Sequence, residues 1–235
     1  MKKLKFASIL LLAIMLATGC KKNEETPIID ATVEEAASIM ATSFCTGNAG
    51  TMTQVEDAVD LSQAVMLKSV LTDSSFSISS APGALITYQY EVNYSYGFMT
   101  PNNYQLSFES TGDYSSPNVS ASSTAAGLMN VSGFLTGGSY IVNGQSGRDG
   151  VFAMKIGNKN SINGTVTTTI TSFKINKTSG ILESGTATIA VAGNTSAGRS
   201  FGFTGTLIYQ GNYNASLTIN SQIFNVNINT GVVTK

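Results

Sequence analysis

The segment ITYQYEVNYSYGF, at positions 86–98, constrains the fold of this chain most, because its apolar and polar residues alternate strictly. Only a β-strand places alternate residues on opposite faces, so the segment predicts a strand with one apolar and one polar face. A stable fold must bury the apolar face. The residues expected on that face are Ile86, Tyr88, Tyr90, Val92, Tyr94, Tyr96 and Phe98.

The same period of two returns in later segments and predicts further strands with one apolar face. The apolar sets are Tyr104, Leu106 and Phe108; Ala187, Ile189 and Val191; Phe201, Phe203, Leu207 and Tyr209; and Phe224, Val226 and Ile228. Pro101 and Asn102 predict a turn between the strand at 86–98 and the strand that contains Tyr104, so these two strands form a hairpin. All four prolines lie outside the predicted strands. The aromatic residues of this first hairpin are expected to dominate the core.

Short turn-forming pairs separate the strands, and no segment between them is long and apolar enough to be a crossover helix. The predicted turns are Asn143-Gly144, Asp149-Gly150, Ser179-Gly180, Gly193-Asn194 and Gly211-Asn212. The chain is therefore predicted to be mainly β, an antiparallel up-and-down meander of about ten strands. A closed barrel, a sandwich, or a curled sheet covered by helices would each bury the apolar face.

Two short helices are predicted before the sheet, in a segment spanning residues 30–72. Thr32 with Glu35 forms a capping box for the first helix, and Thr53 with Glu56 forms one for the second. A Gly-containing break at 45–50 separates them. The apolar positions of both helices repeat at helical spacing, so the pair is expected to pack on the sheet.

The first twenty residues have the three parts of a secretory signal: a basic start, an apolar run over 6–17, and small residues before Cys20. The apolar run is shorter than the roughly 20 residues that span a bilayer. The segment resembles a bacterial lipobox, with Ala17 where the pattern prefers a bulky aliphatic residue. The resemblance implies a thioether-linked diacylglycerol on Cys20 and cleavage after Gly19, with acyl chains such as palmitate. The alternative is a plain signal peptide cut near Ala17.

The predicted organisation is a lipoprotein signal peptide at 1–19, a flexible tether at 20–29, the helical segment at 30–72 and the β domain at 73–235. The tether begins with two lysines and soon continues with two glutamates, and such a charged stretch stays in water. No Asp follows Cys20 directly, which favours outer-membrane localisation, on the periplasmic face or at the cell surface. The lysine–glutamate stretch resembles a surface-export tag of Bacteroidetes lipoproteins, and a mere linker explains it equally well.

Several segments together resemble a group of uncharacterised Bacteroidetes lipoproteins. They are TVEEAASIMATS, QVEDAVDLS, SYIVNGQSGRDG and GNYNASLTINSQIFNVNINTG, and they extend over most of the mature chain. The resemblance implies a β-rich exported domain, and it implies no activity, cofactor or catalytic residue. This chain has Asn220-Ser221 where such proteins often have Asn-Gly, which weakens the expectation of a hairpin turn there.

Charge and cysteine content exclude several function classes. Twelve of the 14 acidic residues lie between Lys21 and Asp113, and the basic residues of the second half are scattered, so nucleic-acid binding is not expected. Two cysteines cannot build a disulfide scaffold once Cys20 is lipidated. Cys45 would then pair between molecules, react, or be buried as a small hydrophobe, and we favour burial.

The chain has no histidine, which removes the commonest general base and the usual nucleophile triads. Glu91 and Glu109 become neighbours if Pro101-Asn102 centres the first hairpin, and a carboxylate pair is what glycosidases need. Their otherwise polar, open face favours solvated surface acids instead. The tyrosines suggest either core packing or an apolar or glycan ligand site.

The sequence thus predicts no catalytic, cofactor or metal residues and one modified residue, Cys20. The predicted function is a non-enzymatic surface or periplasmic binding or structural module, held in the membrane through the lipid on Cys20. The alternative is a carrier of a lipid or other apolar ligand inside a curled sheet. The sequence does not determine the oligomeric state.

Overall fold

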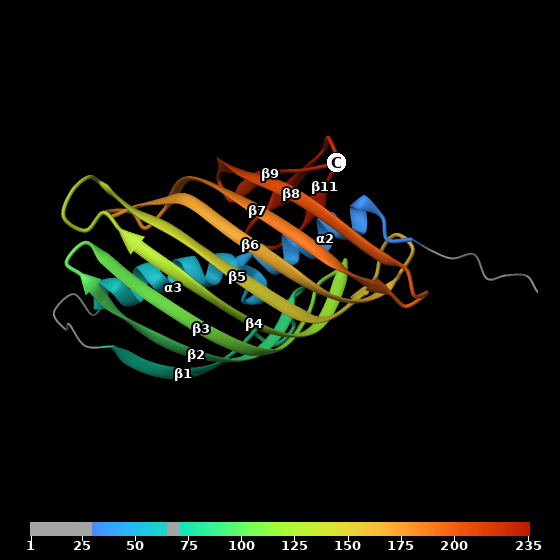
Figure 1. The fold of residues 1–235 in the computed structure, drawn as a ribbon, viewed down its shortest axis with the longest axis horizontal. Coiled ribbons are helices and arrows are strands. Elements are labelled where there is room, and N and C mark those ends of the chain that lie inside the picture. The colour runs from blue at the N-terminus through green and yellow to red at the C-terminus, as the bar shows by residue number, and fades with distance from the viewer. Residues whose placement is uncertain (1–29, 65–70) are drawn as a thin grey trace, which may run out of the picture.

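The computed structural model describes residues 30–64 and 71–235, which form one curled antiparallel sheet around two helices (Figure 1). Eleven strands follow one another in chain order, and the sheet is not closed into a barrel. The predicted meander preceded by two helices is confirmed. Of the three arrangements that the sequence allowed, the structure adopts the curled sheet covered by helices.

The helical elements are α2 (Val33–Phe44), η1 (Thr46–Asn48) and α3 (Thr51–Ala64). The strands are β1 (Thr72–Ser79), β2 (Thr87–Thr100), β3 (Asn103–Ser115), β4 (Val119–Ser132), β5 (Ser139–Met154), β6 (Ser161–Asn176), β7 (Leu182–Thr195), β8 (Ser200–Gly211), β9 (Asn214–Ile219), β10 (Gln222–Asn227) and β11 (Val233–Thr234).

Helix α2 fills the hollow of the sheet. Its predicted capping box is present: Thr32 Oγ1 accepts from the Glu35 amide at 3.1 Å, and Glu35 Oε2 accepts from the Thr32 amide at 2.9 Å. Every residue from Glu35 to Phe44 is buried, and α2 contacts strands β4 to β11. A helix buried on all sides must carry small or apolar residues all round, and the sequence AASIMATSF does so.

The second predicted capping box is wrong. Helix α3 begins at Thr51, two residues before Thr53, and the Thr53 hydroxyl donates to the Thr46 carbonyl at 3.0 Å instead of capping the helix. Gly50 makes this early start feasible, since a Cβ there would lie 2.4 Å from the Cys45 carbonyl oxygen. The link between the two helices is therefore two residues shorter than the capping box at Thr53 predicts.

The alternation that predicted β2 and β3 is confirmed residue by residue. The even-numbered residues of β2 from Tyr88 to Phe98 are buried or half-buried, and the odd-numbered residues from Thr87 to Asn93 are exposed; Ile86 lies just before the strand. The turn falls at Pro101-Asn102, with a bulge between Phe98 and Thr100. The predicted inner residues Tyr104, Leu106 and Phe108 are all buried. The first hairpin therefore forms one wall of the core, as expected.

Two of the five predicted turns are confirmed and three are wrong. Ser179-Gly180 lies in the β6–β7 turn, and Gly211-Asn212 marks the end of β8 and the start of the β8–β9 turn, which consists of Asn212 and Tyr213. Asn220-Ser221 also forms a turn, with positive φ at both residues, despite the lack of a glycine. The pairs that lie inside strands β5 and β7 instead are Asn143-Gly144, Asp149-Gly150 and Gly193-Asn194.

The glycines inside the strands serve close packing of the sheet. Gly150 pairs with Gly164, and Gly164 pairs with Gly193, so three glycines form one row across β5, β6 and β7. A Cβ at Gly164 would lie 2.4 Å from the Ala192 carbonyl oxygen. Glycine inside a strand commonly marks such a close approach of backbones. These residues therefore mark positions where the strands come close together, rather than chain reversals.

Candidate functional site

The residues singled out by the sequence do not meet in one site. Cys20 lies outside the described residues, and its lipidation stays a prediction. Cys45 is buried at the end of α2, as favoured, and its thiol donates to the Thr42 carbonyl at 3.5 Å. Glu91 pairs with Thr111 and Glu109 pairs with Asn93, so the two acids are not directly opposite each other. Both are exposed on the outer face of the sheet, as the interpretation as surface acids predicts.

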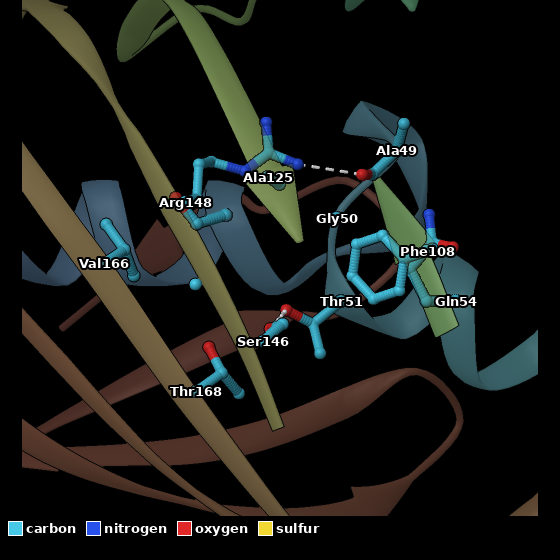
Figure 2. Close-up of a pocket in the computed structure, with 12 residues that line it drawn as sticks. Ala49, Gly50, Thr51, Gln54, Phe108, Ala125, Ser146, Arg148, Val166 and Thr168 are labelled. Atoms are coloured by element: carbon cyan, nitrogen blue, oxygen red, sulfur yellow. Dashed lines mark hydrogen bonds between the residues drawn. The ribbon is translucent and has the colours of Figure 1, made fainter. Parts of the chain in front are cut away.

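A buried arginine, which the sequence did not single out, links the sheet to the helices (Figure 2). Arg148 on β5 is 6% exposed. Its guanidinium donates to Tyr90 Oη at 2.7 Å, to Ser123 Oγ at 3.0 Å and to the Ala49 carbonyl at 2.8 Å. It also lies 5.3 Å from the centre of the Tyr90 ring and 5.8 Å from that of Tyr114. Neutral oxygens and aromatic rings thus stabilise this buried cation.

The space beside Arg148 is small. The cavity in Figure 2 measures about 10 Å³, close to the minimum that holds one water molecule. Ser43 Oγ and Gln54 Oε1 border it without a hydrogen-bond partner among the described residues. This region is therefore a clamp between sheet and helices, too small for an organic ligand.

A larger cleft opens where the first turns of α3 face the β6–β7 and β8–β9 turns. Its volume is about 250 Å³, near the lower end of the usual range for ligand pockets. Two of its apolar residues are well exposed, Ile181 at 61% and Tyr213 at 56%. The residues that line it are Met52, Glu56, Ile175, Ser179, Gly180, Ile181, Leu182, Tyr209, Asn212, Tyr213 and Ile228. An apolar lining with few polar groups is the usual composition of a ligand site.

Glu56 is the acidic residue of this cleft. Its side chain reaches solvent, yet the surrounding protein displaces enough water to raise its pKa to about 7, and the charges of Asp57 and Asp60 add to the effect. Burial also raises the pKa of Asp57, although a 2.5 Å hydrogen bond from Tyr94 Oη opposes that shift. The cleft therefore contains a carboxyl group that changes charge near neutral pH.

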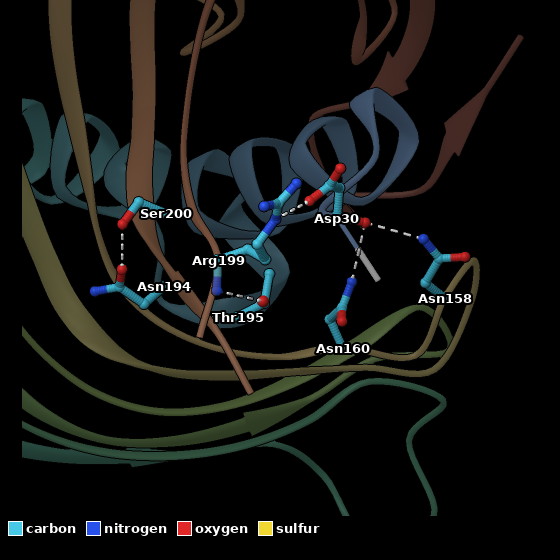
Figure 3. A network of polar contacts seen from close by, with 7 residues as sticks. All are labelled: Asp30, Asn158, Asn160, Asn194, Thr195, Arg199 and Ser200. Atoms are coloured by element: carbon cyan, nitrogen blue, oxygen red, sulfur yellow. Dashed lines mark hydrogen bonds and ion pairs between the residues drawn. The ribbon is translucent and has the colours of Figure 1, made fainter. Parts of the chain in front are cut away.

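The described chain enters the fold at the opposite end of the sheet, where Asp30 is held between two turns (Figure 3). Arg199 Nε lies 2.8 Å from Asp30 Oδ1, and its hydrogen bond lowers the pKa of that carboxyl. The Asp30 carbonyl accepts from Asn158 Nδ2 at 2.9 Å and from Asn160 Nδ2 at 3.4 Å. The β5–β6 and β7–β8 turns thus fix the first described residue.

The cleft and Asp30 lie at opposite ends of the same strands. In a meander, alternate turns lie at opposite ends, so the β6–β7 turn of the cleft is one strand length away from the β7–β8 turn at Arg199. Strand β7 has 14 residues, which corresponds to roughly 40 Å at about 3.3 Å per residue. The cleft and the first described residue, Asp30, therefore lie at opposite ends of the sheet.

Comparisons with known proteins found no relative of this chain. No protein-family model, no curated protein and no solved structure matches this chain. Within residues 30–64 and 71–235, no group of three or more cysteine, aspartate or glutamate side chains could hold a metal ion. Over the same residues, no helix has the length and hydropathy that a membrane span needs.

Proposed function

We propose that this protein is a non-enzymatic binding module, anchored in the outer membrane by a lipid on Cys20, whose ligand site is the cleft at the far end of the sheet. The observation that carries the proposal is the cleft itself, with about 250 Å³ of space and two apolar residues, Ile181 and Tyr213, exposed to solvent. Exposed apolar residues that gather in a concave site commonly mark a binding site.

The position of Asp30 supports this arrangement. Asp30 lies ten positions after Cys20, and an extended chain of that length reaches at most about 35 Å. A lipid on Cys20 would keep the Asp30 end of the sheet near the membrane and leave the cleft roughly 40 Å further out. A site that meets ligands from the medium is well placed there.

The alternative, a carrier with its ligand inside the curl, has less support. Helix α2 occupies the hollow of the sheet, and the cavity beside it is about 10 Å³. A lipid chain needs far more room than one water molecule.

The ligand site is tested by isoleucine-methyl NMR of the full chain in lipid nanodiscs, titrated with 2-phenylethanol. We expect the methyl signals of Ile181 and Ile228 to shift and that of Ile223, which is 63% exposed outside the cleft, to stay in place. Ile181→Ser should weaken binding at least about threefold, since it removes most of one apolar contact. Ile223→Ser is the matched control and should leave binding unchanged. Equal shifts at all exposed isoleucines, or none, would overturn the assignment of the cleft.

The anchor is tested separately by cell fractionation. Cys20→Ser should move the protein out of the membrane fraction, because two acyl chains supply most of the membrane affinity. Retention of the variant in membranes with normal signal processing would refute the anchor. Protease treatment of intact cells distinguishes the cell surface from the periplasmic face.

A further inference from the structure

The charged residues in the lining of the cleft and on helix α3 are acidic. Among the described residues that line it, Glu56 is the single carboxylic acid and none is basic. Helix α3 adds Asp57 and Asp60, whose charges act on Glu56. The β6–β7 turn contributes Ser179 and hydrocarbon side chains. Asn212, two tyrosines and Ile228 complete the lining. The site therefore attracts positive charge and repels anions.

The aromatic lining favours the same kind of ligand. Tyr209 and Tyr213 belong to the β8–β9 hairpin and border the cleft that also holds Glu56. The faces of tyrosine rings attract cations, and recognition of ammonium groups by aromatic rings is a common use of this attraction. The Tyr213 amide also donates to Tyr209 Oη at 3.3 Å, which holds the two residues together.

We propose that the cleft binds a small organic cation, with an ammonium group beside Glu56 and a hydrocarbon part against the tyrosines and isoleucines. This inference rests on the proposed function, since it names the ligand class of the same site. Three features of the cleft carry it: an acid with no basic residue among the described residues of the lining, two tyrosines in the same lining, and apolar walls. A neutral apolar ligand would use the walls and leave the acid without a role.

Ionisation of Glu56 should control the affinity. An acid with a pKa of about 7 is roughly ten times more ionised at pH 8 than at pH 6. A ligand that stays cationic over this range should therefore bind several-fold more tightly at pH 8. A neutral ligand of the same shape should bind about equally at both pH values.

The test compares 2-phenylethylammonium with its neutral isostere 2-phenylethanol by methyl NMR titration of the full chain in nanodiscs. At pH 8 we expect the ammonium to bind about fivefold more tightly, from the combined cation–π and ion-pair contributions. Glu56→Gln should remove the pH dependence and the ion-pair part of this preference, and leave only the smaller part that cation–π contact supplies. Glu91→Gln removes a surface acid outside the cleft and should change neither.

The outcomes separate the two proposals. Equal binding of the two probes at Ile181, unaffected by Glu56→Gln, would overturn the cation inference and leave the cleft as a ligand site. Failure of both probes to shift the Ile181 methyl signal would overturn the proposed function as well. A preference for the ammonium that Glu91→Gln removes and Glu56→Gln keeps would place the cation elsewhere and refute the inference.

Discussion

The Arg148 guanidinium donates a 2.8 Å hydrogen bond to the carbonyl oxygen of Ala49, which joins the middle of β5 to the link between the two helices. Ala49 has a left-handed backbone, with a φ of 50°, at the point where the chain turns from η1 into α3. An arginine can donate to this carbonyl oxygen and also to Tyr90 and Ser123, because its guanidinium group has five N–H donors. This contact fixes the helix pair in the hollow of the sheet.

Arg148→Met should lower the free energy of unfolding by about 3 kcal/mol. The substitution keeps an unbranched side chain but leaves the Ala49 carbonyl, Tyr90 and Ser123 without their donor, and each buried group left without a partner costs about 1–3 kcal/mol. Urea unfolding of the two proteins measures the difference. Arg199→Met, at a side chain that is 52% exposed, is the matched control and should cost much less stability than Arg148→Met. Equal losses for both variants would contradict the role of Arg148 as a clamp.

Gly50→Ala should destabilise the fold by about 2 kcal/mol. The new Cβ would lie 2.4 Å from the Cys45 carbonyl oxygen and 2.7 Å from that of Ser43, and backbone atoms cannot move aside as a flexible side chain does. Thermal unfolding should show a lower midpoint. A Cβ at Gly202, on β8, would meet nothing within 4 Å, so Gly202→Ala is the control and should stay within about 0.5 kcal/mol of the parent. A Gly50→Ala variant as stable as the Gly202→Ala variant would show that the link between the helices is not tightly packed.

The sequence predicted the sheet well where the signal is local. The alternation over 86–98 specifies which residues of β2 are buried, and a two-residue turn follows at once at Pro101-Asn102. The turn prediction failed at Gly150 and Gly193. The sequence alone does not distinguish a glycine that forms a turn from a glycine inside a strand that lies close to the backbone of the next strand. Only the pairing of Gly150 with Gly164, and of Gly164 with Gly193, distinguishes them.

The candidate site was harder to predict because its residues are far apart in the chain. Glu56 belongs to a helix, and Ile181 and Tyr213 belong to two separate connections between strands. A signal was present: Ile181 and Tyr213 are bulky apolar residues placed directly after the turn pairs Ser179-Gly180 and Gly211-Asn212, where polar residues are usual. Period-two analysis overlooks them, since it searches strands and not turns. Arg148 was overlooked for the opposite reason, because a lone basic residue in a polar segment resembles a surface residue.

Asn160→Ala should cost about 2 kcal/mol, whereas Asn158→Ala should cost under about 0.5 kcal/mol. Asn160 is 4% exposed and donates to Glu35 Oε2 at 3.1 Å, so it supports the carboxylate that caps α2. Hydrogen bonds to charged groups contribute about 1.5–3 kcal/mol. Asn158 is exposed, and water can replace its bond to the Asp30 carbonyl. Chemical denaturation of the two variants compares the same substitution two positions apart, and the reverse order of stability would contradict the buried role of Asn160.

The raised pKa of Glu56 predicts a protein that loses stability as the pH rises. The folded state holds the proton up to a pH of about 7, whereas the unfolded chain releases it near its ordinary value of 4.5. The folded state therefore binds more protons between these values, and the free energy of unfolding falls across that window. Glu56→Gln removes the titration, so it should raise the melting temperature at pH 8 by about 2–4 °C and change it little at pH 4, after allowance for screening of a side chain that reaches solvent. Thermal unfolding at pH 4, 6 and 8 measures the difference, with Glu91→Gln as the control for loss of one exposed acid. A uniform shift at all three pH values would show that the glutamine acts through packing and that the Glu56 carboxyl is not the titrating group.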